Sequence, residues 1–170
     1  MERDPVDRIM EQWRNGRPDL DHAPVAIVGR VNLLSQLMTA ELERTFATFG
    51  ISHGLFDVLA SLRRAGPPYR LSPTALFQQL LLSSGGMTHR LDKLEHAGLV
   101  ERLPDPEDRR ALHVGLTPKG LALVDRAIEA HLANEERLIA ALGPEQRDAL
   151  AALLRTLVLA QNRQSEERSE

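Results

Sequence analysis

The stretch SSGGMTHRLDKL (residues 83–94) places two glycines directly before the start of an amphipathic helix. Met87, Leu91 and Leu94 recur at spacings of four and three and predict an apolar stripe along one helix face. Thr88 and His89 fall outside that stripe. Glycines in this position can cradle a phosphate-bearing cofactor, or they can open a helix that approaches another molecule closely. The flanking sequence separates these two interpretations.

The segments on either side of this helix predict a winged helix-turn-helix. Upstream, Ser52 caps one predicted helix, and Ser72-Pro73 begins another that reaches about Leu81, after a short strand-like segment. Downstream, residues 98–117 change from helical periodicity to alternation, which is typical of a β-hairpin, and the polar loop PDPEDRR (104–110) lies at its tip. The order helix, helix, tight turn, helix and hairpin with a basic tip is that of a winged helix-turn-helix.

The same pattern disfavours a cofactor loop. The sequence contains neither GxGxxG nor GxxxxGK[ST], and no parallel-strand context precedes the glycines. In a winged helix-turn-helix the helix after the glycines would enter the DNA major groove, and its first N–H groups would face a phosphate. The hairpin tip would reach the minor groove or the neighbouring phosphates. Small residues before a helix, and a charged loop, are each common in proteins that do not bind DNA. The order of the helices and the hairpin around them favours DNA binding here. The predicted DNA-binding residues are Ser72, Thr74, Ser83, Ser84, Gly86, Thr88, His89, Lys93, Arg109 and Arg110.

Helices are predicted on both flanks of this central region. Asp4-Pro5 begins a short helix to about Trp13, and a long helix follows from Pro24 to Gly50. Thr117-Pro118 caps a further helix, and a last one follows Gly143-Pro144 and reaches about Arg163. The last helix is apolar around most of its circumference, which predicts cover by a partner subunit. We therefore expect a mainly α fold with a small β-hairpin wing, in which residues 51–117 form the DNA-binding winged helix-turn-helix between the flanking helices of residues 1–50 and 118–170.

Composition narrows the class of protein. The chain has 170 residues and no cysteine, which excludes disulfides and thiolate chemistry. Its net charge is −3, but residues 63–94 carry five arginines and lysines against Asp92 alone, so the centre is basic. No stretch suits a signal peptide or a membrane span, and we expect a cytoplasmic protein without membrane contact.

Catalysis, cofactors and metals are not expected. No GxSxG or HExxH motif is present. The six histidines are scattered, and the pairs His53/Asp57 and Asp92/His96 each supply only two ligands, which is weak evidence for zinc.

The segment from residue 71 to residue 120 resembles the MarR family of multiple-antibiotic-resistance-type transcriptional regulators. The matching landmarks are SSGGMTHRLDKLE, GLVER leading into the wing, DPEDRR at its tip and LTPKG opening the next helix. The resemblance implies a homodimer held together by the N- and C-terminal helices of residues 1–50 and 118–170, with the ligand pocket in residues 1–50. Such a dimer binds a palindromic operator in double-stranded DNA and usually represses, with recognition helices roughly 34 Å apart. His89 stands where similar relatives often have asparagine, so the resemblance does not carry over an operator preference.

Arg90 has a different predicted role from its neighbours. It follows Met87 by three residues and precedes Leu94 by four, which places it beside the buried stripe, facing the scaffold. A guanidinium there needs an anion, and Asp57 on the preceding predicted helix could supply one. Such a pair could be a switch or purely structural.

Four residues further resemble the urate-responsive branch of the MarR family: Trp13, Asp57, Arg64 and Arg90. The resemblance implies that Trp13 and Arg64 anchor a planar anionic purine, that Asp57 is repelled by its charge, and that Arg90 changes partners. A lone tryptophan is more often simply packed, and a phenolic carboxylate could also satisfy two arginines and an indole. The sequence therefore predicts a repressor released from DNA by a small aromatic anion such as urate. The alternative is a winged-helix protein-interaction module that does not bind DNA.

Overall fold

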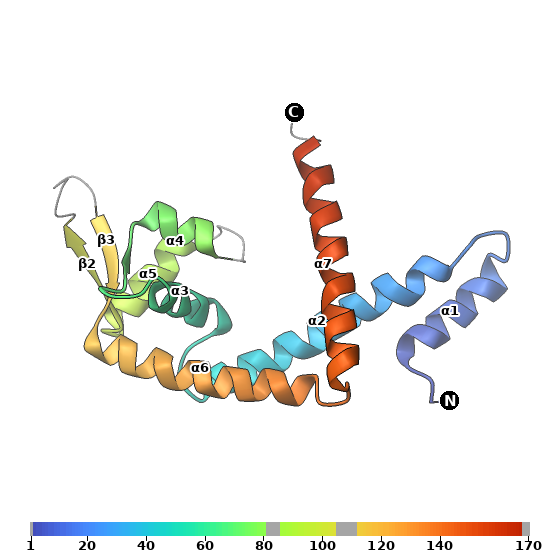
Figure 1. Cartoon of the computed structure of the whole chain (residues 1–170), viewed down its shortest axis with the longest axis horizontal. Coiled ribbons are helices and arrows are strands. Elements are labelled where there is room, and N and C mark those ends of the chain that lie inside the picture. The colour runs from blue at the N-terminus through green and yellow to red at the C-terminus, as the bar shows by residue number, and fades with distance from the viewer. Residues whose placement is uncertain (1, 81–85, 105–111, 168–170) are drawn as a thin grey trace. The chain divides into compact units, whose positions relative to one another are not determined.

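The computed structural model describes residues 2–80, 86–104 and 112–167, drawn in colour in Figure 1. Contacts divide the chain into two compact units, of which one ends at His131 and the other begins at Leu132, inside a single helix. The described elements, in chain order, are α1 (Pro5–Gly16), α2 (Ala23–Ala47), α3 (His53–Arg64), β1 (Arg70–Leu71), α4 (Pro73–Gln79), α5 (Met87–His96), β2 (Val100–Pro104), β3 (Leu112–Leu116), α6 (Pro118–Leu138) and α7 (Pro144–Glu167). The fold is therefore mainly helical with a small sheet, as the sequence predicts.

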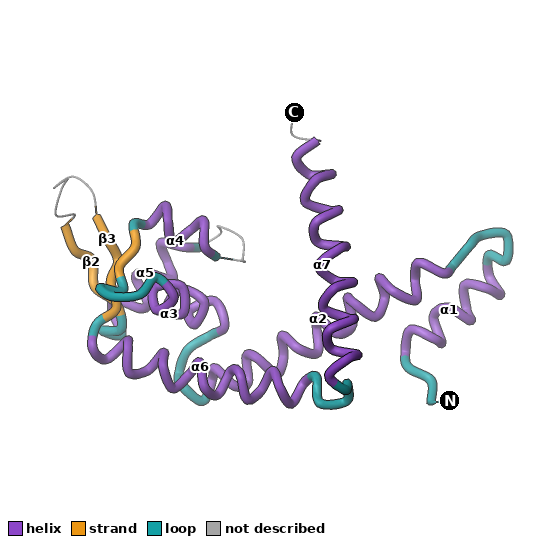
Figure 2. The backbone as a smooth tube through the Cα atoms, viewed as in Figure 1, coloured by secondary structure: helices purple, strands orange, loops and turns teal. Residues whose placement is uncertain are grey.

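The core of the first unit lies between α3, α5 and the sheet. Val58, Leu59 and Leu62 of α3 are fully buried, and Leu94 of α5 packs in the same cluster as Val114 of β3. The three strands, orange in Figure 2, form an antiparallel sheet in the order β1-β3-β2. The hairpin β2–β3 is the predicted wing, and the predicted minor strand adds a third member, β1, on the far side of β3.

The helix α1 is fixed to the first half of α2. Asp4 caps α1, because its carboxylate accepts hydrogen bonds from the backbone N–H groups of Val6 (2.7 Å) and Asp7 (3.0 Å). Arg30 of α2 then binds the carboxylates of Asp4 and Asp7, each at 2.7 Å. These contacts join the start of α1 to the first half of α2 at Arg30.

Several element ends differ from the predictions by a few residues. The helix α1 continues to Gly16, three residues past Trp13, and α7 continues to Glu167, because no proline or glycine follows Arg163 to end it. The long helix α2 ends at Ala47, and the chain makes a turn before Gly50. The predicted end of the α4 helix and the serines before α5 lie outside the described residues.

Large apolar side chains are exposed on the outer helices. Along α2 they include Ile27, Val28, Val31, Leu34 and Leu37, and along α7 Leu150, Leu153, Leu154, Leu157, Val158 and Leu159. The exposed fraction reaches 65% at Leu153. Single exposed leucines are ordinary, but continuous apolar faces of this length indicate an interaction surface. Within the described part of the chain, no helix is both long enough and apolar enough to cross a membrane.

The start of α6 packs against the end of the α5–β2 turn through Gly120. A Cβ atom at this position would lie 1.9 Å from the backbone carbonyl oxygen of Leu99. Leu99 is buried, and its carbonyl accepts a hydrogen bond from the N–H of Thr117. The Leu99 backbone therefore cannot move away from Gly120 without disturbing the core and this hydrogen bond. Only glycine fits this contact.

We expect Gly120→Ala to lower the free energy of unfolding by about 2 kcal/mol, the usual range for forced overpacking. Urea unfolding followed by circular dichroism would measure the change. Gly16→Ala is the matched control, because a Cβ at Gly16 has no heavy atom within 4 Å. Equal stability of the two variants would contradict the close approach.

Candidate functional site

The two faces of α5 have opposite surroundings. Leu91 and Leu94 are buried against the core, as predicted, and Thr88 and His89 are exposed on the opposite side. His96, two turns after His89, is exposed on the same outward face. The helix therefore presents a continuous polar surface to solvent, and the sequence reasoning missed His96 as part of it.

Of the other predicted DNA-binding residues, the structure describes four, which belong to α4, to α5 or to the residue before each of these helices. The Ser72 hydroxyl accepts a hydrogen bond from the N–H of Ala75 at 3.1 Å and caps α4, and Thr74 is exposed in the first turn of that helix. Gly86 precedes α5 with φ at +88°, a left-handed conformation that favours glycine. Lys93 is exposed on α5. Ser83, Ser84, Arg109 and Arg110 lie outside the described residues.

Arg90 faces α3, as its spacing predicts. Its guanidinium lies over Gly54, where a Cβ atom would be 3.1 Å from Nε and 3.2 Å from Cζ of Arg90. The Nη1 atom of Arg90 is buried and has no hydrogen-bond partner. The absence of a side chain at Gly54 thus makes the space for an arginine of α5, a role that the sequence reasoning missed.

The predicted direct ion pair between Asp57 and Arg90 is not formed. The Oδ2 atom of Asp57 is buried without a hydrogen-bond partner, and its Oδ1 atom lies 3.5 Å from Nε2 of His53, one turn earlier on α3. Burial raises the pKa of the Asp57 carboxyl, and the nearby positive charges of His53, Arg90 and Arg64 lower it by less. Asp57 and Arg90 are therefore close enough to interact electrostatically, and each retains an unsatisfied buried atom.

Aromatic rings line the α3 side of this charge cluster. Phe46 of α2 stacks on His53, with ring centroids 5.5 Å apart, and on Phe56 at 4.1 Å. His131 of α6 lies edge-on to Phe56 at 5.1 Å and within electrostatic reach of Asp57. Sequence reasoning noted the spacing of His53 and Asp57 only as a weak metal pair, and nothing in the sequence placed His131 beside them.

Arg64 lies on the same helix, two turns after Asp57. Its Nη2 atom donates a hydrogen bond of 2.9 Å to the hydroxyl of Ser61, which is buried. Asp57, Ser61 and Arg64 thus follow one strip of α3, as their spacing predicts. The structure brings Asp57, Arg64 and Arg90 into one electrostatic cluster.

Trp13 does not join this cluster within one chain. Its ring is 49% exposed and stacks on His22, the residue directly before α2, at a centroid distance of 6.0 Å. The cluster instead contacts Phe46, near the other end of α2. Twenty-four residues of helix separate His22 from Phe46, about 36 Å at 1.5 Å per residue. The predicted four-residue pocket is therefore incomplete in a single chain.

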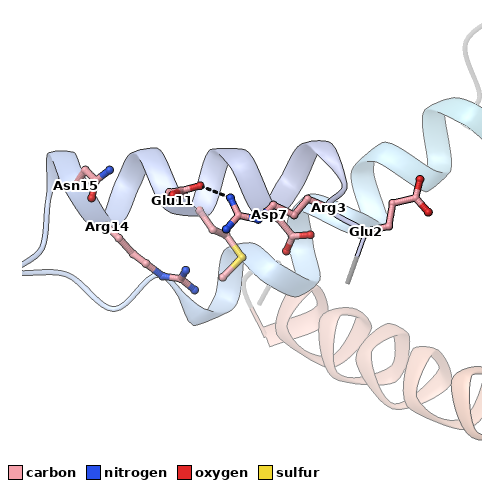
Figure 3. Close-up of a pocket in the computed structure, with 7 residues that line it drawn as sticks. Glu2, Arg3, Asp7, Glu11, Arg14 and Asn15 are labelled. Carbon is pink, nitrogen blue, oxygen red and sulfur yellow. Dashed lines mark hydrogen bonds and ion pairs between the residues drawn. The ribbon is translucent and has the colours of Figure 1, made fainter.

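A separate hollow of about 440 Å³ lies along α1 (Figure 3). It is lined by Glu2, Arg3, Asp7, Met10, Glu11, Arg14 and Asn15. Arg3 binds Glu11 at 2.8 Å, and three carboxylates line the hollow, which disfavours an anion there. Over the residues that the structure describes, no group of three or more histidines and carboxylates is arranged to hold a metal ion.

We expect Asp57→Asn to raise the free energy of unfolding at pH 7 by on the order of 1 kcal/mol, the scale of an unsatisfied buried polar group. Because the pKa of Asp57 in the folded chain is raised above its ordinary value of 3.8, the folded state holds its proton to higher pH than the unfolded state does. Wild-type stability therefore falls as the pH rises from about 3.8 through the raised pKa, and the advantage of the Asp57→Asn variant vanishes below that window. Urea unfolding at several pH values would measure this, with the exposed Asp148→Asn as control. A variant less stable than wild type at pH 7 would show that the charged carboxylate stabilises the fold.

Comparisons with known proteins agree with this architecture. The sequence profile of the MarR family matches residues 51–112. The helix-turn-helix transcriptional regulator PecS of Dickeya dadantii is 40% identical over 149 residues, which cover 88% of this chain and 90% of PecS. The structure of AbsC, a MarR family transcriptional regulator from Streptomyces coelicolor, has a TM-score of 0.73 and 25% identity, covering 84% of this chain and 97% of AbsC. A cysteine-to-serine variant of MarR from E. coli, in complex with operator DNA, has a TM-score of 0.68 and 26% identity over 85% of this chain and 96% of its own. The chain therefore belongs to the MarR family of DNA-binding, winged-helix transcriptional regulators.

Proposed function

We propose that the chain acts as a homodimeric repressor that binds a palindromic operator and is released by a small aromatic anion. Urate is the leading candidate for that anion, and a phenolic carboxylate is the second. In this proposal residues 51–117 bind DNA, and the helices of residues 1–50 and 118–170 hold two copies together.

The outward face of α5 supports groove reading. Thr88 and His89 stand exposed on it, and Lys93 adds a positive charge. Gly86 lets the backbone approach DNA closely at the start of α5, and Thr74 of α4 lies in an exposed first turn. In the proposal Ser72, Ser83 and Ser84 contact phosphates, and Arg109 and Arg110 at the wing tip reach the minor groove.

The exposed apolar faces of α2 and α7 support a dimer. They carry valine, isoleucine and leucine side chains that remain 40% exposed or more in one chain, which is unfavourable in water. A second copy would cover them, and would also bring another Trp13 to the assembly.

The observation that carries the ligand proposal is the unsatisfied pair of Arg90 and Asp57. A buried guanidinium nitrogen and a buried carboxylate oxygen, each without a hydrogen-bond partner, are uncommon and costly. Arg90 belongs to the helix that reads DNA, yet its charge is directed toward α3. An anion that accepts a hydrogen bond from Arg90 would stabilise the guanidinium and repel Asp57.

The proposed switch follows from that competition. Arg64 and Trp13 anchor the planar anion, Asp57 is repelled by it, and Arg90 changes partners, which displaces α5 from its DNA-reading position. Because the distance along α2 separates Trp13 from the cluster, the indole in each site comes from the partner subunit. Ligand and DNA then weaken each other's binding by the same factor.

For DNA binding, we expect the full chain to select a palindromic duplex from a random-sequence pool, with half-sites one helical turn apart. If it contacts six or more phosphates, affinity should fall by roughly a thousandfold between 50 and 200 mM salt. Electrophoretic mobility shifts at several salt concentrations would measure both. Failure to bind any duplex at low salt would favour the alternative, a winged-helix protein-interaction module.

For the ligand, we expect urate to quench the fluorescence of Trp13, the single tryptophan, in a saturable manner after correction for urate absorbance. Arg64→Ala should weaken urate binding at least about tenfold, because it removes a charge-assisted hydrogen bond. Arg126→Ala is the matched control, since Arg126 is exposed on α6 and bonds the Ala122 carbonyl of its own helix. If Arg64→Ala binds urate as tightly as the wild-type chain, the proposed pocket is wrong.

The origin of the indole can be tested by coexpressing Trp13→Ala chains with Arg64→Ala chains. If Trp13 comes from the partner subunit, each mixed dimer contains one intact site, and calorimetry detects urate binding that neither variant shows alone. If both residues come from one chain, the mixture binds no better than its parents.

A further inference from the structure

Arg102 of β2 forms two ion pairs with the outward side of α5. Its Nη2 atom lies 2.5 Å from a carboxylate oxygen of Asp92, and its Nη1 atom lies 2.6 Å from one of Glu95. The hydrogen bond with Asp92 raises the pKa of Arg102. A single wing residue thus holds both acidic side chains of the helix that faces DNA.

The position of these acids makes them unfavourable for DNA binding. Asp92 follows Thr88 and His89 by one turn, and its side chain is 55% exposed. In the proposed complex a carboxylate one turn from the groove-reading residues would lie near the phosphates, and like charges repel. Lys93 is the only lysine or arginine of α5 besides Arg90, whose guanidinium lies over α3. Without Arg102, the outward face of α5 would carry more negative than positive charge.

The two ion pairs of Arg102 contribute little to the stability of the fold. The side chains of Arg102, Asp92 and Glu95 are 32%, 55% and 38% exposed, and ion pairs this exposed to solvent typically contribute little to stability. They do, however, set the sign of the charge that an approaching polyanion meets on this side of α5.

We propose that Arg102 is a positioning residue for DNA binding, which masks the charges of Asp92 and Glu95 so that the recognition helix can enter the groove. The inference rests on the proposed use of α5 in DNA binding. It assigns to the first strand of the wing a function separate from that of the basic wing tip.

The test compares full-length variants on the duplex selected by the wild-type chain. We expect Arg102→Gln to weaken binding about tenfold at low salt, because two unmasked charges then face the phosphates, and the loss to shrink as salt screens them. Arg102→Lys should retain most of the affinity. Arg126→Gln, which removes an exposed arginine from α6, should have little effect.

Compensation decides between masking and direct contact. The triple variant Arg102→Gln, Asp92→Asn, Glu95→Gln should recover the affinity that Arg102→Gln loses. If it does not recover, Arg102 itself contacts DNA and the proposal is wrong, as it also is if Arg102→Gln binds normally.

A second variant tests the proposal if circular dichroism shows that Arg102→Gln does not fold. This double variant carries Asp92→Asn and Glu95→Gln and keeps Arg102. Masking predicts that it binds DNA as tightly as the wild-type chain or more tightly, whereas weaker binding would mean that the ion pairs hold the wing in place and would contradict masking. Absence of binding by the wild-type chain would instead overturn the proposed function.

Discussion

The seating of α5 on α3 is the constraint on which the rest of the structure depends. Leu91 and Leu94 bury one side of α5 in the common core, and Arg90 extends over Gly54 on the same side. Burial of that side exposes the other, so the residues available to DNA follow from the packing of the helix. The same seating brings an arginine of the recognition helix beside Asp57 of the scaffold. The α3 side of α5 and its outward side are therefore two faces of one packed helix.

Arg102, which contacts α5 from β2, and Arg90, which belongs to α5, have opposite electrostatic surroundings. Arg102 is partly exposed and has two carboxylate partners, so its pairs add little to stability and mainly set the charge of a surface. Arg90 retains a buried nitrogen without a hydrogen bond, and Asp57 retains a buried oxygen in the same state. An unsatisfied buried group typically costs about 1–3 kcal/mol, and such a cost is most often retained where a function needs it. The first arginine is a paired charge at the surface, and the second is a buried charge whose hydrogen bonds are incomplete.

Much of the fold could be predicted because its signals are local. Proline and capping residues mark the helix starts, as at Asp4 and Ser72, and the change from helical to alternating periodicity marks the wing. The candidate site was predictable only in part. The helical spacing of Asp57 and Arg64 places them on one strip of α3, whereas the contribution of His131 depends on how a helix more than 60 residues later crosses α3. Trp13 shows the limit of family resemblance, because the length of α2 separates it from the cluster within one chain, although the sequence pattern groups them.

The sequence by itself determined the order of the helices and the wing, the buried stripe of α5 and the inward direction of Arg90, since each follows from periodicity within one element. Tertiary structure decided what those side chains meet. It placed Arg90 over Gly54 rather than in contact with Asp57, paired Asp57 with His53, and brought Arg102 to the acids of α5. These outcomes depend on the distance and angle between elements, which are set by the packing of the whole core and carry no signature in local sequence.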